Sequence, residues 1–198
     1  EGLKKDKIFN VGDIMFDSTI YFSNVAEKSS NILNKLNIKK QEYILATIHR
    51  PENTDNPKKL RNIFDALSNL DFKIIIPIHP RTRNKLLEYK CQIGEKINLI
   101  DPVGFFDMII LEKNASKIAT DSGGIQKEAF FHGVPCITMR EQTEWIELLQ
   151  DGINILTGSN LKKLKNALSL DLKPFKPNKI YGSGDTAVKI RKTIKLFL

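Results

Sequence analysis

The sequence has few of the features that define several common protein classes. Only two of its 198 residues are cysteines, Cys91 and Cys136, and they have neither CxxC nor metal-ligand spacing. We therefore expect no disulfide framework and no bound metal. No apolar run reaches the length of a transmembrane helix, and no signal peptide opens the chain. These absences predict a cytoplasmic protein with no membrane partner.

Clustered charge of one sign is also scarce. The net charge is +8, from 31 basic and 23 acidic residues, but the lysines are distributed over several predicted helices. No long basic block is interleaved with aromatic residues, so we expect solvated helix faces and no nucleic-acid partner. The chain has no internal repeat, and its length suits one α/β domain with or without a small appendage.

What the sequence does contain is an alternation of short apolar runs and helical patterns. Continuous apolar runs of this length, separated by helices, are typical of buried parallel strands. The expected strands are residues 8–11, 43–48, 73–78, 98–100, 117–120, 135–139 and 153–156. Helices are expected within residues 13–36 and at about 58–70, 82–90, 106–114, 124–132, 143–150, 160–168 and 185–197. The predicted fold class is α/β with a Rossmann-like parallel sheet.

The most informative stretch is residues 120–129, where two glycines follow a strand and open a helix. Such a turn presents free N–H groups and the positive end of the helix dipole, and glycine lets a phosphate approach closely. Glu128 lies one turn beyond Gly124, where its carboxylate would bind the two hydroxyls of a ribose. This pattern indicates a nucleotide or nucleotide-sugar site. The alternative is a plain turn in which Ser122 or Asp121 caps the helix and Glu128 is solvated.

Three further loops follow predicted strands, at residues 49–53, 79–83 and 140–144. In an open α/β sheet, ligands bind outside the carboxyl ends of the strands, where all four loops would meet. The histidines and arginines that come to this edge are His49, His79, Arg50, Arg81, Arg83 and Arg140. A rim of guanidinium and imidazole groups would hold a diphosphate well.

Each of these residues also has a simpler interpretation. His79, which precedes a proline, is equally explained as a structural histidine. Arg81 and Arg83 fit the solvated start of a helix. Glu52 and Asn53 fit a turn ahead of the next helix. Their convergence on one edge is what favours a binding site.

Five motifs together resemble those of one enzyme family. They are His49-Arg50-Pro51-Glu52-Asn53, His79-Pro80-Arg81, Asp121-Ser122-Gly123-Gly124-Ile125-Gln126-Lys127-Glu128-Ala129, Gly133-Val134-Pro135 and Arg140-Glu141-Gln142-Thr143-Glu144. Their order and spacing are similar to those of the non-hydrolysing UDP-N-acetylglucosamine 2-epimerases, whose fold is of GT-B type with two Rossmann-like domains. The resemblance covers nearly the whole chain but only the C-terminal half of that family.

The resemblance implies a division of the chain into three parts. Residues 1–12 would be the end of a linker from an N-terminal domain. Residues 13–180 would be the nucleotide-sugar-binding Rossmann-like domain, the second domain of a GT-B fold. Residues 181–198 would be a C-terminal helix that crosses back to the other domain.

The resemblance also implies an activity, the interconversion of UDP-GlcNAc and UDP-ManNAc by elimination and re-addition of UDP, with no cofactor and no metal. His49 matches the catalytic histidine at the diphosphate. Ser122 and Gly123 match the phosphate-binding turn, and Glu128 matches the ribose carboxylate. Arg50 and His79 match positions that, in bacterial members, bind a second, regulatory UDP-sugar. The full set of expected substrate-binding residues is Arg50, Glu52, Asn53, His79, Arg81, Ser122, Gly123, Gly124, Gln126, Glu128, Arg140, Thr143 and Glu144.

Two positions depart from the family pattern. Lys127 stands where many members have glutamate, and Trp145 stands where many have an arginine that contacts the nucleotide. The substrate is therefore UDP-GlcNAc or a modified UDP-sugar. A homodimer is expected for the full-length enzyme, and this chain alone is expected to be inactive. The alternatives are the nucleotide-binding domain of a GT-B glycosyltransferase and a non-catalytic binding module.

Overall fold

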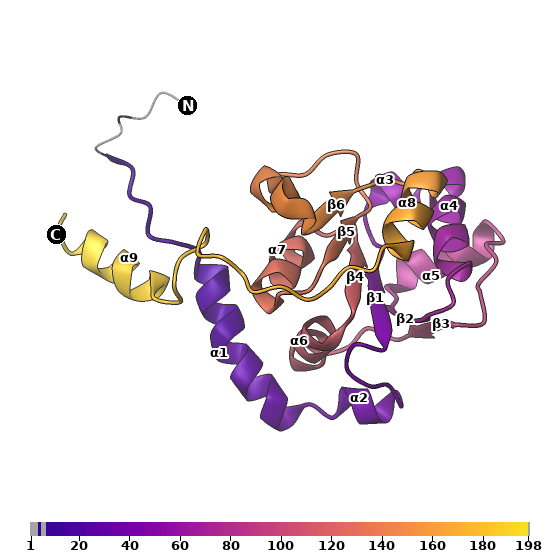
Figure 1. Ribbon diagram of the computed structural model, residues 1–198, viewed down its shortest axis with the longest axis horizontal. Helices are drawn as coiled ribbons and strands as arrows, with labels where there is room; N and C mark the ends of the chain where they lie inside the picture. The colour runs from indigo at the N-terminus through magenta and orange to yellow at the C-terminus, as the bar shows by residue number, and fades with distance from the viewer. Residues whose placement is uncertain (1–3, 5–6, 198) are drawn as a thin grey trace.

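A computed structural model of the protein describes Lys4 and residues 7–197, which form a layered α/β structure around one parallel sheet (Figure 1). The six strands are in the order β3-β2-β1-β4-β5-β6, and every neighbouring pair is parallel. Their bounds are β1 (Tyr43–Thr47), β2 (Lys73–Pro77), β3 (Ile97–Ile100), β4 (Lys117–Thr120), β5 (Cys136–Thr138) and β6 (Asn154–Leu156). The strand order reverses between β1 and β4, which is the place where doubly wound sheets bind ligands. The predicted fold class is confirmed.

Helices cover both faces of the sheet. One face carries α4 (Pro57–Ser68), α5 (Pro80–Glu88) and α8 (Leu161–Ser169), whose apolar side chains share a core with the strands. The other face carries α1 (Ile14–Ser29), α2 (Ile32–Lys35), α6 (Phe105–Asn114) and α7 (Gly123–His132). The remaining helices are α3 (Pro51–Thr54), the 3-10 helix η2 (Ile146–Gly152) and α9 (Thr186–Ile194).

The apolar runs form strands because both of their faces are buried. Ile44 and Ala46 of β1 pack into the layer under α4, whereas Tyr43 and Leu45 pack into the layer under α6. All five residues of β1 are buried. This two-residue alternation between two apolar layers is what a central parallel strand requires.

The helix boundaries follow local signals in most places. Asn56 accepts hydrogen bonds from the N–H groups of Lys58 and Lys59 at the start of α4. Gly133 ends α7 with φ of 69°, a left-handed conformation that glycine adopts without strain. The expected stop at Gly133 is confirmed.

Three predicted elements differ from the structure. Residues 8–11 are not a strand. They run outside the sheet, where no strand edge lies beside them, and Ile8 and Phe9 are 58% and 46% exposed. The helix expected within residues 13–36 breaks at Ser30, whose backbone is extended. The Ser30 hydroxyl bonds instead to Asp107 of α6. The helix expected at 143–150 is the later 3-10 helix η2.

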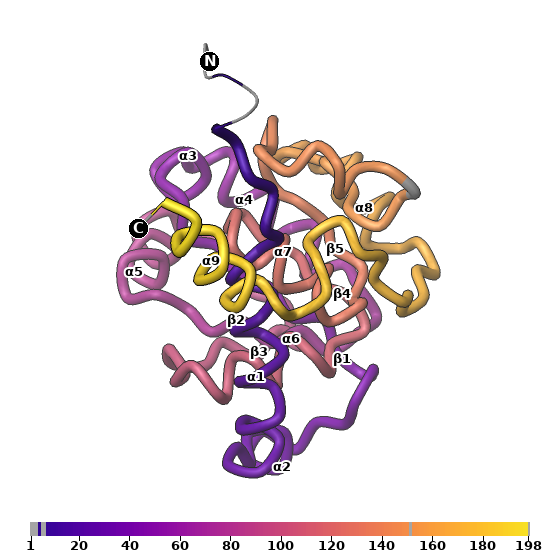
Figure 2. Tube along the Cα trace, turned by 90° about the vertical axis from the view of Figure 1, so that its left-hand side faces the viewer, coloured from indigo at the N-terminus to yellow at the C-terminus, as the bar shows by residue number. Residues whose placement is uncertain are grey.

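Both ends of the described chain lie on one side of the molecule, beside the start of α1 (Figures 1 and 2). Phe9 and Phe197 pack edge to face, with ring centroids 5.5 Å apart. Within Lys4 and residues 7–197, no helix is both long and apolar enough to cross a membrane.

Candidate functional site

The centre of the site is the buried carboxylate of Asp121, at the end of β4. It is fully buried and accepts hydrogen bonds from the backbone N–H groups of His49 and Arg50, at 3.1 Å each, in the loop that follows β1. The side-chain amide of Asn53 donates to the same carboxylate and also to the Met139 carbonyl after β5. Asp121 and Asn53 together thus connect the loops that follow β1, β4 and β5 at the switch point of the sheet.

The glycine turn lies directly beyond Asp121. The Ser122 hydroxyl accepts a hydrogen bond from the N–H of Ile125 and so caps α7. Because α7 begins at Gly123, the N–H groups of Gly123 and Gly124 have no acceptor within the helix. Both point with the helix dipole toward an anion at the helix start.

The two glycines are not explained by the protein's own packing. Neither has a positive φ, and a Cβ atom on either would meet its nearest neighbours at ordinary contact distances of 3.6 Å or more. Another residue would therefore fit the backbone at both places. Close approach of a ligand to the N–H groups does require glycine, so the pair supports an anion site.

A cationic group stands beside the turn. Arg140, which follows β5 and is 7% exposed, holds the Glu144 carboxylate through two hydrogen bonds of 2.7 and 2.9 Å. This contact with Arg140 lowers the pKa of Glu144 to about 2. The guanidinium lies 3.9 Å from the Cβ position of Gly123, and the Trp145 indole donates to the Gly123 carbonyl. Oε2 of Glu144 lies 3.7 Å from the same Cβ position, so an anion on the turn would meet the Arg140–Glu144 ion pair.

The second histidine loop is held by its own contacts. Nδ1 of His79 accepts the N–H of Arg81 at 3.2 Å and so caps α5. Arg81 bonds to both carboxylate oxygens of Asp55, next to α3, and Arg83 bonds to Asp101. Both arginines are thus paired within the chain, and both pairs are solvent-exposed.

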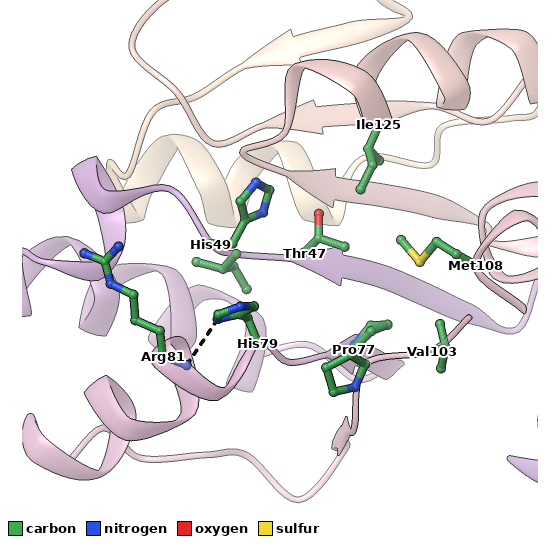
Figure 3. Close-up of a pocket in the computed structure, with 10 residues that line it drawn as sticks. Thr47, His49, Pro77, His79, Arg81, Val103, Met108 and Ile125 are labelled. Carbon is green, nitrogen blue, oxygen red and sulfur yellow. Dashed lines mark hydrogen bonds between the residues drawn. The ribbon is translucent and has the colours of Figure 1, made fainter. Parts of the chain in front are cut away.

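A cavity of about 350 Å³ opens at the ends of β1, β2 and β3 (Figure 3). Its apolar wall comes from Pro77, Val103, Met108 and Ile125, and His49 and His79 stand at its polar side. Ile125 belongs to the first turn of α7, so the cavity adjoins the glycine turn. Flat apolar walls with polar groups at one side suit an aromatic heterocycle such as a nucleobase.

Glu128 lies one turn into α7, near the buried acid Glu112 of α6. Burial raises the pKa of Glu128, against the opposing charge of Lys127. Burial, followed by the charge of Glu128, raises the pKa of Glu112 on α6 well above its usual range. Nε2 of His132 lies 3.9 Å from the Glu112 carboxylate, and burial lowers the pKa of His132 to about 4. Both shifts favour the uncharged forms of Glu112 and His132.

Lys127 is one of the two departures from the family pattern, and it is enclosed. Its ammonium pairs with Asp13, the N-cap of α1, and lies 4.5 Å from the centroid of the Trp145 ring. Only 6% of Lys127 is exposed. The two departures, Lys127 and Trp145, are therefore in contact with each other and tie α7 to the start of α1.

The predicted residues fall into two groups. His49, Arg50, Glu52, His79, Arg81, Ser122, Gly123, Gly124, Glu128, Arg140 and Glu144 lie around the carboxyl edge. Asn53 and Gln126 are buried, and Gln126 accepts hydrogen bonds from Thr143 and Asn154. Asn53, Gln126 and Thr143 thus hold the loops in place.

Two parts of the site were not among the predicted residues. The sequence predicts Asp121 as part of the third motif and as a possible helix cap, but not as a contact of the loop after β1. The cavity wall from Pro77, Val103 and Met108 carries no sequence signal, because these residues look like ordinary apolar positions.

Comparison with known proteins gives consistent matches over nearly the whole chain. The family model described as UDP-N-acetylglucosamine 2-epimerase matches residues 1–195. A UDP-N-acetylglucosamine 2-epimerase homolog of Methanococcus maripaludis is 48% identical over 95% of this chain and 54% of its own length. The UDP-2,3-diacetamido-2,3-dideoxy-D-glucuronate 2-epimerase of Pseudomonas aeruginosa is 38% identical over 94% of this chain and 52% of its own length.

This chain is also similar to a solved structure. The Methanocaldococcus jannaschii UDP-GlcNAc 2-epimerase, in complex with UDP-GlcNAc and UDP, is similar with a TM-score of 0.86 and 38% identity. The similarity covers 98% of this chain and 56% of that one. The chain spans about half the length of the curated relatives it matches.

Proposed function

The chain belongs to the UDP-N-acetylglucosamine 2-epimerase family, and we propose that it is the UDP-binding half of such an enzyme. The complete enzyme would interconvert UDP-GlcNAc and UDP-ManNAc, or the corresponding epimers of a modified UDP-sugar. Two relatives carry these two names, a UDP-N-acetylglucosamine 2-epimerase and a UDP-2,3-diacetamido-2,3-dideoxy-D-glucuronate 2-epimerase.

The observation that carries the proposal is the arrangement around the glycine turn. The N–H groups of Gly123 and Gly124, with the Arg140 guanidinium beside them, suit a diphosphate. The adjoining 350 Å³ cavity suits uracil, and Glu128 on the same helix suits the ribose hydroxyls. Gly123, Gly124, Ile125 of the cavity wall and Glu128 all belong to α7, so one helix would contribute to all three subsites.

The reaction requires UDP to leave C1 of the sugar while a base removes the proton at C2. UDP then adds back after C2 is protonated on the other face. His49 is placed at the rim between the turn and the cavity, where it would exchange a proton at the diphosphate. The carboxylates that act at C2 would come from the rest of the enzyme, so this chain supplies the cradle for the departing diphosphate.

Four further features belong to the proposal. Residues 1–12 would be linker, residues 13–180 the nucleotide-sugar domain, and α9 within residues 181–198 a helix that packs on the other domain. Arg50 and His79 would bind a second, regulatory UDP-sugar.

Both cysteines are free, which suits a reducing cytoplasm. The complete enzyme would be a homodimer.

Isothermal titration of this chain with UDP tests the proposal. We expect UDP to bind, and Glu128→Ala to weaken binding by about 1–3 kcal/mol, because ribose hydroxyls and buried groups would lose their partner. Glu95→Ala removes the same charge from an exposed position that borders neither the glycine turn nor the cavity and should leave UDP affinity unchanged. Equal affinity of Glu128→Ala and the parent chain would remove Glu128 from the ribose site.

A further inference from the structure

His49 and His79 stand on adjacent strand ends at the same rim, but their Nδ1 atoms have opposite surroundings (Figure 3). Nδ1 of His79 accepts the backbone N–H of Arg81 at 3.2 Å. A nitrogen that accepts a hydrogen bond carries a lone pair, so the proton of neutral His79 must be on Nε2. His79 therefore presents an N–H donor to a ligand.

Nδ1 of His49 lies close to an acceptor instead. It lies 3.3 Å from Oδ1 of Asp121, whose side chain is fully buried, whereas the imidazole is 49% exposed. An ionised carboxylate has only acceptor sites, so a neutral imidazole beside it is favoured with its proton on Nδ1. Nε2 of His49 is then the nitrogen with the free lone pair.

Asp121 acts as a hydrogen-bond acceptor toward its other neighbours. Its oxygens accept the N–H groups of His49 and Arg50 and the side-chain amide of Asn53, at 3.1 Å each. Because both oxygens already accept hydrogen bonds from N–H donors, we expect Oδ1 to be an acceptor toward Nδ1 of His49 as well. The Arg140 guanidinium adds a nearby positive charge.

We propose that Asp121 is a positioning residue for His49, holding its proton on Nδ1 so that Nε2 exchanges the proton with the ligand. The two imidazoles of the rim then have different tasks: His49 accepts a proton at Nε2, and His79 donates a hydrogen bond from Nε2. When His49 takes up a proton, the resulting imidazolium charge is balanced by Asp121. The catalytic role of Asp121 rests on the proposed function. The assignment of the two histidine tautomers does not.

Long-range 1H–15N NMR correlation of the 15N-labelled chain, recorded at a pH where the imidazoles are neutral, tests the assignment without any ligand. The chain has three histidines, so His49→Gln and His79→Gln identify the signals. We expect His79 in the Nε2–H form and His49 predominantly in the Nδ1–H form, within one spectrum. His49 in the Nε2–H form would overturn the proposal, whether or not the chain binds UDP.

Two variants separate the carboxylate from the loop that it holds. Asp121→Asn should move His49 toward the Nε2–H form, because an amide can donate to Nδ1, and should leave His79 unchanged. Asn53→Ala removes a loop contact but keeps the carboxylate, so His49 should keep the Nδ1–H form. The same His49 tautomer in Asp121→Asn as in the parent would contradict the role of Asp121. If Asp121→Asn does not fold, the spectra of the parent and Asn53→Ala still decide the assignment.

Discussion

The carboxyl edge of the sheet and the adjoining surface of α1 and α9 differ in how fully their side chains are packed. The polar groups at the edge are buried and paired, whereas the apolar groups of the surface are exposed. At the edge, Asp121 and Asn53 are buried and bonded to three loops that are far apart in the sequence. On the surface beside it, large apolar side chains are exposed, among them Tyr21 at 65% and Leu196 at 77%. The two regions meet at the start of α1, where Met15 lies 3.7 Å from the Cβ position of Gly124.

This difference teaches which properties belong to the chain alone. The edge is assembled entirely from its own residues, so we expect ligand binding from this chain by itself. The apolar surface has the composition of an interface rather than of a solvated face. Since the relatives are about twice as long, we propose that their additional half covers this surface and completes the catalytic site.

The largest expected effect is a complete absence of catalysis. In heavy water, this chain should give no deuterium exchange at C2 of UDP-GlcNAc, because it offers a cradle for UDP but no base at C2. Without the remaining half, water also screens the charges around the diphosphate. NMR detection of C2 exchange is the measurement. Exchange that is abolished by Glu52→Gln or Glu144→Gln would show that the edge contains the base.

A second prediction concerns the buried support beneath the edge. The pKa of His132 is lowered to about 4 by burial, below the 6.5 of an exposed histidine. Because the folded state resists protonation, this residue's contribution to stability is present above pH 6.5 and is lost as the pH falls toward 4. Between pH 7.5 and pH 4, the parent should lose about 3 kcal/mol of unfolding free energy relative to His132→Gln.

Urea unfolding of both proteins across this pH range measures that difference. The other titrating groups are common to the two proteins, so their contributions largely cancel in the comparison. A gap between the two unfolding free energies that stays constant with pH would show that His132 is not held neutral.

The smallest expected effect concerns the apolar surface. Leu196→Ser and Phe197→Ser change side chains that are 77% and 70% exposed. In this chain they should alter the unfolding free energy by less than about 0.5 kcal/mol, as exposed positions usually do. Thermal unfolding is the measurement. A loss of 2 kcal/mol or more, the scale of a buried apolar side chain, would mean that these two side chains pack on the chain's own body.

Much of the fold follows from the sequence, because runs such as Ile74-Ile75-Ile76 are apolar on both faces, as central parallel strands require. Turn chemistry likewise indicates the start of α7 and its end at Gly133. The break at Ser30 was not predictable, because it depends on Asp107, which is distant in the sequence. The strand expected at residues 8–11 has an apolar pattern but no neighbouring strand to pair with.

The site was predictable to a similar degree. Loops after parallel strands must meet at one edge, which brings His49, His79 and Gly123 together on topology alone. Burial was not predictable: nothing in the sequence indicates that Asn53 and Gln126 turn inward or that Asp121 bonds to the loop at residues 49–53. Those facts depend on the packing of β4 and β5 against their neighbours.

The most direct measurement of the central claim is a crystal structure of this chain with UDP. We expect the diphosphate to bind to the N–H groups of Gly123 and Gly124 beside Arg140. We also expect uracil to lie against Met108 in the 350 Å³ cavity and the ribose hydroxyls to bind Glu128. A larger cavity of about 560 Å³ lies near Lys117 and Asp171, toward the opposite end of the sheet. UDP bound there, with the glycine turn free, would contradict the account.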